Sequence, residues 1–238
     1  MSSSCSPRNL HWLRFYDLAF DLDHHDLRLK EILDLDLLDS TSLFEVWEMP
    51  KLRNFSVYNG RLPDPVEGQD STILADLSTL EDIAFPTSLK KLSLTYYGFS
   101  WENMTIIGSS LPNLEVLKLD NTGEGAEWSP IEREFLRLKV LVIESHDLEQ
   151  WEVEDIHFSN LHGFYLRSMS RLKEIPLSIG DINTLQSIHL IFCLESAMIS
   201  AIEIVKDQKE KRNKSLQVYV NLKQVFSYSN VNSLTLDW

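Results

Sequence analysis

Apolar residues recur along the chain in a six-residue spacing, with leucine or another large apolar residue at the first, fourth and sixth positions. A clear example is Leu114-Glu-Val-Leu117-Lys-Leu119. The last two apolar residues alternate with their neighbours, a period of 2 that predicts a short strand with one buried face. The spacing begins again after 25, 24, 23 and 24 residues, with first positions at Leu89, Leu114, Leu138, Leu161 and Leu185.

A constant period of this length is the signature of leucine-rich repeats, whose units run about 20–29 residues. No unit can bury its leucines alone, so the stacking of neighbouring units creates the core. Residues 10–88 follow the pattern less regularly. If Lys30 replaces a first leucine, Leu33 and Leu35 become the strand leucines of that unit. The irregular units start at Leu10, Lys30, Leu52 and Leu74.

The fold class that we predict is an α/β solenoid, a leucine-rich-repeat horseshoe of about nine irregular units of roughly 20–25 residues. Its short parallel strands line the concave face. We expect the solenoid over residues 1–195, with regular units over 89–195 and irregular units over 10–88. Residues 196–238 then form a C-terminal cap, with a helix over 196–212 and terminal strands. The helix is indicated by an apolar stripe of Ala197, Ala201, Ile204 and Val205.

The repeat consensus places Asn or Cys three residues beyond the last strand leucine, where its side chain satisfies buried backbone groups. Cys193 conforms to this rule, and Thr122 is a polar substitute. The other units depart from it, so we expect loops of variable shape. Their residues at this position are Gly60, Tyr97, His146 and Met169.

Composition and charge narrow the possible partners. Leucine supplies 38 of 238 residues, and 36 Asp+Glu against 22 Lys+Arg give a net charge of −14. This acidity argues against nucleic acid, whose phosphates would be repelled. No apolar run approaches the roughly 20 residues of a transmembrane helix. The acids concentrate in residues 17–39 and 115–155. They indicate solvated faces or, alternatively, a surface that pairs with a basic partner.

Few residues in the sequence are candidates for metal binding or catalysis. His24-His25-Asp26 could supply metal ligands, but adjacent residues do not converge easily on one ion, and no zinc spacing accompanies them. No G-x-S-x-G elbow is present. Cys193 stands where repeats place a buried structural cysteine, and only Cys5 accompanies it, so a reducing compartment is expected. We therefore predict no enzyme, no metal and no cofactor.

The repeat geometry predicts a binding surface, because residues beside the strand leucines form columns on the concave face. The first column is Ser56, Ser93, Lys118, Val142, Tyr165 and His189. The second is Tyr58, Thr95, Asp120, Glu144, Arg167 and Ile191. Scattered polar residues on an exposed sheet need no ligand, which is the alternative interpretation. The candidate partner-binding residues are Tyr58, Ser93, Thr95, Lys118, Asp120, Glu144, Tyr165, Arg167 and His189.

Several segments resemble a known family. Phe85-Pro-Thr-Ser-Leu-Lys-Lys-Leu-Ser-Leu94 is similar to repeats of plant intracellular immune receptors of the nucleotide-binding, leucine-rich-repeat class. More specific are Leu172-Lys-Glu-Ile-Pro176 and the Cys193-x-x-Ser-Ala segment that leads into a helix. Together these segments resemble the C-terminal end of the late blight resistance protein family of nightshade-type plants. The resemblance covers most of the chain, and residues 85–220 strongly.

The resemblance implies a recognition module in plant defence. Its partner would be a pathogen effector or the receptor's own nucleotide-binding switch, which the repeats restrain until a hypersensitive response follows. The implied location is the cytoplasm, or the periphery of a membrane in the parent receptor. Nucleotide binding itself does not carry over, because the sequence has no G-x-x-x-x-G-K-[ST] motif. The alternative is the substrate-recognition repeat domain of an F-box-type ubiquitin-ligase adaptor, although residues 1–10 are too short for an F-box.

Overall fold

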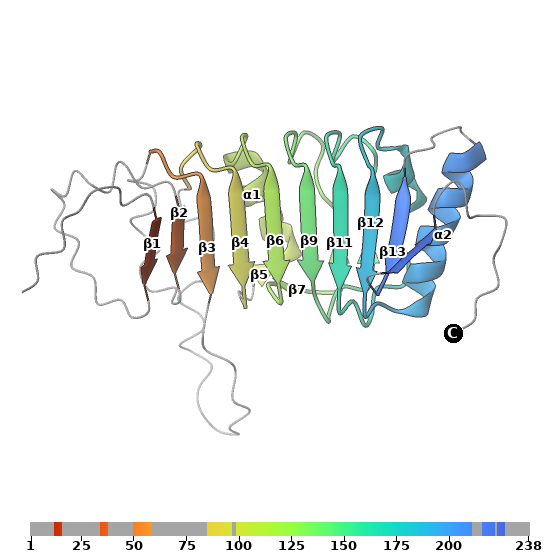
Figure 1. The fold of residues 1–238 in the computed structure, drawn as a ribbon. Coiled ribbons are helices and arrows are strands. Elements are labelled where there is room, and N and C mark those ends of the chain that lie inside the picture. The colour runs from red at the N-terminus through yellow and green to blue at the C-terminus, as the bar shows by residue number, and fades with distance from the viewer. Residues whose placement is uncertain are drawn as a thin grey trace, which may run out of the picture.

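The computed structural model describes residues 12–15, 34–37, 50–58, 85–96, 99–210, 216–221 and 223–226. Within them lies one main sheet of ten strands, in the order β1-β2-β3-β4-β6-β9-β11-β12-β13-β14 (Figure 1). Its first five strands are β1 (Trp12–Phe15), β2 (Asp34–Leu37), β3 (Asn54–Tyr58), β4 (Lys91–Thr95) and β6 (Val116–Asp120). The others are β9 (Val140–Glu144), β11 (Gly163–Arg167), β12 (Ser187–Ile191), β13 (Gln217–Val220) and β14 (Lys223–Phe226).

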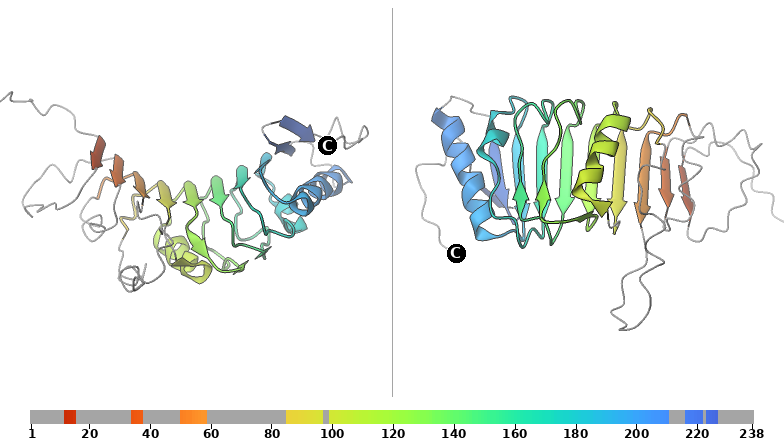
Figure 2. Two further views of the ribbon diagram at one scale, coloured as in Figure 1. Left: turned by 90° about the horizontal axis from the view of Figure 1, so that it is seen from below. Right: turned by 180° about the vertical axis from the view of Figure 1, so that it is seen from behind.

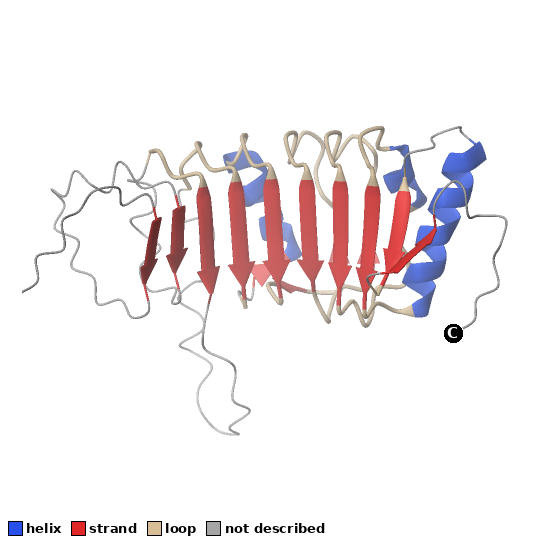
Figure 3. Ribbon diagram, viewed as in Figure 1, coloured by secondary structure: helices blue, strands red, loops and turns tan. Residues whose placement is uncertain are grey.

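The main sheet is parallel from β1 to β13, and only β14 pairs antiparallel, with β13. The sheet is curved and open, not closed into a barrel, and its strands line the concave side (Figure 2). Such an architecture is compatible with the predicted α/β class. Few helices occur among the described residues (Figure 3). They are η5 (Trp101–Asn103), α1 (Met104–Ser110), η6 (Leu177–Asp181) and α2 (Glu195–Glu210).

The convex side carries the return segments of the chain. Both α helices lie there, behind the sheet as Figure 1 shows it (Figure 2). Two small parallel sheets accompany them, β5 (Phe99–Ser100) with β7 (Gly123–Glu124) and β8 (Glu127–Trp128) with β10 (Gln150–Trp151). Among the described helices, none has the length and apolarity that crossing a bilayer requires.

The strand leucines form the core, as the period-2 alternation predicts. On β4, Leu92 and Leu94 are buried while the flanking residues are half-buried. The parallel register places equivalent residues of successive strands next to one another, so each unit covers the apolar side chains of the one before it. Full burial of such a side chain contributes about 1.5–3 kcal/mol. One such row, with every member inaccessible to solvent, is Phe55, Leu92, Leu117, Leu141, Phe164, Ile188 and Val218.

The register of β2 corrects one prediction. Leu35 pairs with Leu13 of β1 and Phe55 of β3, and Leu37 pairs with Val57. The strand leucines are therefore Leu35 and Leu37, and taking Leu33 and Leu35 was wrong by two residues. A shift of two keeps every side chain on the same face, so alternation alone does not distinguish the two registers. Pairing with β1 and β3 decides between them.

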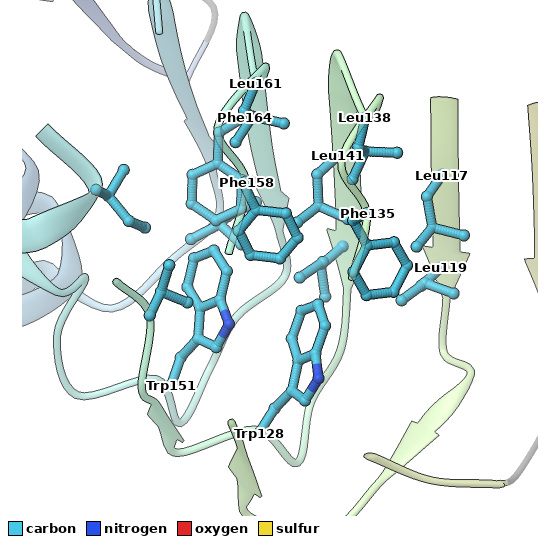
Figure 4. Close-up of a cluster of buried hydrophobic side chains, with 14 of the residues drawn as sticks. Leu117, Leu119, Trp128, Phe135, Leu138, Leu141, Trp151, Phe158, Leu161 and Phe164 are labelled. Carbon is cyan, nitrogen blue, oxygen red and sulfur yellow. The ribbon is translucent and has the colours of Figure 1, made fainter. Parts of the chain in front are cut away.

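Large aromatic rings fill the space between the sheet and the convex segments. Trp128 and Trp151 occupy paired positions on β8 and β10, and their rings stack with centroids 5.6 Å apart. Trp101 extends the stack, 5.3 Å from Trp128, and Trp151 lies 4.7 Å from Phe164 of the main sheet. Figure 4 shows Trp128 and Trp151 beside Phe158, which both tryptophans contact. Stacked aromatic pairs each add about 0.5–1.5 kcal/mol beyond area burial.

The C-terminal helix occurs where the sequence predicts it. Helix α2 covers Glu195–Glu210, and the final residues of the predicted helix, 211–212, lie outside the described residues. The predicted stripe Ala197, Ala201, Ile204 and Val205 is buried. The helix packs closely on η6, because a Cβ on Gly180 would lie 2.8 Å from Ile204 Cγ2. Residues 74–84 of the unit that begins at Leu74, and residues 227–238 of the predicted C-terminal cap, lie outside the described residues.

Candidate partner-binding face

The two predicted columns exist as geometry on the concave side. Register pairs connect the first column through Ser56, Ser93, Lys118, Val142, Tyr165 and His189. They connect the second column through Tyr58, Thr95, Asp120, Glu144, Arg167 and Ile191. Lys118 and Arg167 are exposed, and the other members are half-buried. All nine candidate residues therefore lie on one open surface, while their binding of a partner stays a prediction.

The middle of this face is charged. Lys118 and Asp120 of β6, Glu144 of β9 and Arg167 of β11 make up what we call the charged section. Asp120 and Glu144 are direct neighbours in the parallel register. Burial, and then the charge of Glu144, raise the pKa of the Asp120 carboxyl above its ordinary value. The two acids thus face solvent as a close pair of like charges.

Hydrogen bonds from neighbouring turns hold the acid pair in position. Asn121 Nδ2 donates to Asp120 Oδ1 over 3.0 Å, and Ser168 Oγ donates to Glu144 Oε1 over 2.9 Å. Both donors belong to residues that directly follow a main strand. Because a hydrogen bond to a charged acceptor is stronger than one between neutral groups, these contacts help to hold the two carboxylates in fixed orientations.

The turn after five of the main strands adopts the left-handed conformation. In it, Tyr96 N–H donates to Asp120 O over 2.8 Å, and Asn121 N–H donates to Glu144 O over 2.7 Å. Asn tolerates a positive φ well, whereas a bulky aromatic residue there is uncommon. Phe192 occupies such a turn with 75% of its surface exposed. The residues and their φ values are Tyr96 (59°), Asn121 (46°), Ser168 (52°), Phe192 (54°) and Asn221 (47°).

At two units, the residue three positions beyond the last strand leucine bonds to a buried backbone group, as the repeat consensus predicts. Thr122 Oγ1 donates to the carbonyl of Leu94 over 2.9 Å, and Cys193 Sγ donates to the carbonyl of Leu166 over 3.5 Å. Each side chain thereby satisfies a buried strand carbonyl of the preceding unit. Burial raises the pKa of the Cys193 thiol, which favours its protonated form. A structural role for Cys193 is confirmed by this contact.

The C-terminal part of the face is aromatic. Tyr165 of β11, His189 of β12 and Tyr219 of β13 form what we call the ring section. Their rings stack nearly parallel, at 4.3 Å between Tyr165 and His189 and 4.4 Å between His189 and Tyr219. Burial lowers the pKa of His189, which favours the neutral imidazole. The absence of a side chain at Gly163 makes room for the Tyr165 ring, because a Cβ there would lie 2.9 Å from Tyr165 Cε2.

Sequence reasoning missed Tyr219, although a signal for it was present. The run Leu216-Gln-Val-Tyr-Val220 alternates like the other strands, which places Tyr219 in the first column beside His189. The columns were predicted only as far as Ile191, because the C-terminal segment was interpreted as a cap.

A hollow of about 520 Å³ opens beside the ring section, at the amino ends of β12 and β13. Thr184 and His162 at its margin are engaged with the backbone, Thr184 Oγ1 donating to Leu161 O and His162 Nδ1 contacting Asn160 O. No charged side chain lines it in the part of the chain that the structure describes. The residues that concern its chemistry are Asn183, Gln186, Ser187, His189, Gln217 and Tyr219.

Sequence reasoning did not predict the hollow. Its residues come from the segments that precede strands, as well as from two strands, so no single column contains them. The segments before the strands elsewhere carry ion pairs. Glu115 lies between Lys90 at 3.0 Å and Lys139 at 2.6 Å, and hydrogen bonds to Lys139 and Lys90 lower the pKa of Glu115 to about 2.

Metal binding finds no support in the described part of the chain, where no three His, Cys, Asp or Glu side chains gather as a set of metal ligands. His24-His25-Asp26 lie outside the described residues. No protein-family model matches the sequence.

Known proteins of similar sequence are resistance proteins. A putative late blight resistance protein homolog of Solanum demissum is 31% identical over 156 residues, which is 63% of this chain and 12% of the relative. Another putative homolog from the same plant is 37% identical over 125 residues, 52% of this chain and 10% of the relative. Late blight resistance protein R1-A of Solanum demissum is 34% identical over 125 residues, with the same two shares.

The predicted resemblance to late blight resistance proteins is therefore confirmed over about half of the chain or somewhat more. The matched region spans only 10 to 12% of the length of these relatives.

Proposed function

We propose that the chain is a leucine-rich-repeat recognition module of a plant disease-resistance protein, and that it binds a protein partner through its concave face. The observation that carries the proposal is the pair of unbroken residue columns on an open parallel sheet. Similarity to late blight resistance proteins supports the role in plant defence. On this proposal the strands belong to a horseshoe of about nine repeat units.

The partner is either a pathogen effector or the nucleotide-binding switch of the same receptor, which the repeats restrain before the hypersensitive response. Two features of the face suit a protein partner. The charged section supplies oriented charge, which speeds encounter and selects the register of docking. The ring section supplies rigid aromatic area, the material of binding hot spots.

The same proposal assigns no catalytic role, no cofactor and no metal, and it places the chain in the cytoplasm. The net charge of −14 supports a protein partner over nucleic acid. The alternative, a repeat domain of an F-box-type adaptor, gains no support from the relatives, whose names describe late blight resistance.

The test is co-expression of the full chain with the N-terminal portion of late blight resistance protein R1-A, where the resemblance implies coiled-coil and nucleotide-binding regions. Co-precipitation and suppression of cell death in leaves are measured together. We expect association, because the concave face would find its intramolecular partner there. Absence of both association and any effect on cell death contradicts the proposal.

A pair of matched double variants locates the contact. Asp120→Lys with Glu144→Lys reverses the acid pair on the concave face. Glu124→Lys with Glu127→Lys makes the same change in charge on exposed residues of the convex strands β7 and β8. We expect the first double variant to weaken association at least tenfold and the second to leave it nearly unchanged. Equal losses would show that only net charge matters.

A further inference from the structure

The hollow beside the ring section has a chemistry that differs from the rest of the concave face. We propose that it binds an extended, uncharged stretch of the partner polypeptide, whose backbone amides and Asn, Gln, Ser or Thr side chains hydrogen-bond to its lining. This inference rests on the proposed function, since it names the partner chemistry that one part of the same face accepts.

Unused hydrogen-bonding groups are the first support. Asn183, Gln186 and Ser187 make no side-chain hydrogen bond to the described part of the chain, whereas Thr184 beside them donates to Leu161 O. Each free carboxamide offers two N–H donors and one carbonyl acceptor, and the hydroxyl offers both functions. The lining therefore presents donors and acceptors together, which matches the paired N–H and C=O groups of a peptide.

The ring section adds directional groups of the same kind. Tyr219 donates its O–H to Gln217 Oε1, which leaves the Gln217 amide N–H groups as donors. His189 makes no hydrogen bond to the described residues and contacts its neighbours only by stacking. Because burial lowers the pKa of His189, its imidazole carries one donor nitrogen and one acceptor nitrogen at neutral pH.

The described lining of the hollow offers an ionic ligand no opposite charge. No Asp, Glu, Lys or Arg lines the hollow in the part of the chain that the structure describes. An ion that left water for this site would find no opposite charge to compensate its lost hydration. The charged section presents the opposite case, because Asp120 and Glu144 there suit a cationic side chain.

The stacking geometry leaves no face of the His189 ring open to a flat or sugar ligand. Both faces of the His189 ring are covered, with interplanar angles of 11° to Tyr165 and 2° to Tyr219. A nucleobase or a sugar ring needs an open aromatic face on which to stack. Covered faces leave the ring edges and their polar atoms for contact, and these suit hydrogen bonds to an amide.

The experiment titrates the isotopically labelled full chain with four small probes and follows amide and imidazole resonances by NMR. The neutral probe is acetyl-Ser-Asn-Gln-Ser-amide. Acetyl-Ser-Asp-Glu-Ser-amide and acetyl-Ser-Lys-Arg-Ser-amide are its charged counterparts, and cellotriose represents a sugar. We expect the neutral peptide to shift the resonances of Ser187, His189 and Gln217 at millimolar concentration, and the other probes to do so at least fivefold more weakly.

Variants test whether binding occurs in the hollow. Asn183→Ala with Gln186→Ala should weaken binding of the neutral peptide roughly tenfold, since both substitutions remove hydrogen-bonding groups from the lining. Both residues are exposed, so the fold should tolerate the change. Gln150→Ala removes an exposed carboxamide on the convex strand β10 and should leave binding unchanged.

Three outcomes overturn the inference: no shifts with the neutral peptide, equal binding of a charged peptide or cellotriose, or equal losses in both sets of variants. Its failure is distinguishable from failure of the proposed function. If the chain associates with the N-terminal portion of the relative but ignores the neutral peptide, only the hollow assignment fails. If the peptide binds and that association is absent, only the receptor role fails.

Discussion

The charged section and the ring section lie on the same sheet in the same register, yet they are chemically opposite. In the charged section, Asp120 and Glu144 are like charges in direct contact positions. In the ring section, Tyr165, His189 and Tyr219 stack without any formal charge. The backbone is equivalent in both, because the strands pair in parallel with the same spacing. The difference shows that a parallel sheet of equivalent strands leaves the chemistry of its open face to the residues between the buried leucines.

The two sections also respond to pH with opposite sign. Asp120 has its pKa raised in the folded chain, so the folded state gains stability relative to the unfolded state as pH falls through that pKa. His189 has its pKa lowered, so its contribution is present above its ordinary value of 6.5 and is lost as pH falls below it. A fall in pH thus stabilises the folded chain through Asp120 of the charged section and destabilises it through His189 of the ring section.

The largest loss of stability is expected at a buried residue on a strand that carries part of both the charged section and the ring section. Phe164 is fully buried on β11, the strand that carries both Tyr165 and Arg167. Phe164→Ala should lower the free energy of unfolding by about 3–5 kcal/mol, because it leaves a cavity against Trp151. Urea denaturation followed by circular dichroism measures it. Ile131→Ala, at a residue that is 54% exposed, is the control and should change stability little. A small loss at Phe164 would mean that the two sections are supported separately.

Next in size is the loss of the central ring. His189→Ala removes both stacking contacts of the ring section and should cost about 1–2 kcal/mol in the free energy of unfolding, since the site is half-exposed. The variant should also lose part of the decline in stability between neutral pH and mildly acidic pH. Thermal unfolding across this pH range tests both statements. An unchanged pH profile would show that His189 does not titrate differently in the folded chain.

A smaller effect is expected from exchanging the turn residues of the two sections. Phe192 and Asn121 both adopt a positive φ after a main strand, and Phe192 is 75% exposed. Phe192→Asn should raise the free energy of unfolding by about 0.5–1 kcal/mol, because Asn tolerates this conformation and little burial is lost. Asn121→Phe should be destabilising, since it also removes the donor to Asp120. Chemical denaturation of both variants measures the exchange, and the same sign for both would refute it.

The smallest effect concerns the acid pair. Asp120→Asn removes one of two like charges at neighbouring strand positions, keeps an acceptor for Asn121, and should stabilise the chain by about 0.2–1 kcal/mol at neutral pH. The gain should shrink as pH falls and the native carboxyl becomes protonated. Denaturation at two pH values tests this prediction. A gain that is constant with pH would point to a cause other than charge.

The fold could be predicted from the sequence where the sequence units are regular. Where the units are irregular, the prediction was less accurate. Residues 89–195 alternate cleanly, so their strands and buried leucines were predicted correctly. The strand at β2 was misplaced by two residues, because alternation tolerates an even shift. The stacked tryptophans Trp101, Trp128 and Trp151 were not predicted, since they come from the variable return segments, where no period applies.

The candidate site could be predicted from the sequence to a similar extent. The columns with Asp120, Glu144 and Tyr165 follow from the repeat spacing alone. The hollow does not, because its walls combine Asn183 and Gln186 of a connecting segment with Gln217 of a later strand. Residues 31 or more positions apart in the chain meet there only after the strands have paired.

The sequence by itself determined which residues are buried and which face outward, because a period of 2 in a strand has one physical solution for its apolar side chains. It also determined the family resemblance and the net charge of −14. Only the tertiary structure decided the register of β2, the stacking of His189 between two tyrosines, and the hollow whose described lining carries no charge. These depend on contacts between distant segments, whose geometry is set when neighbouring units stack and not by any local pattern.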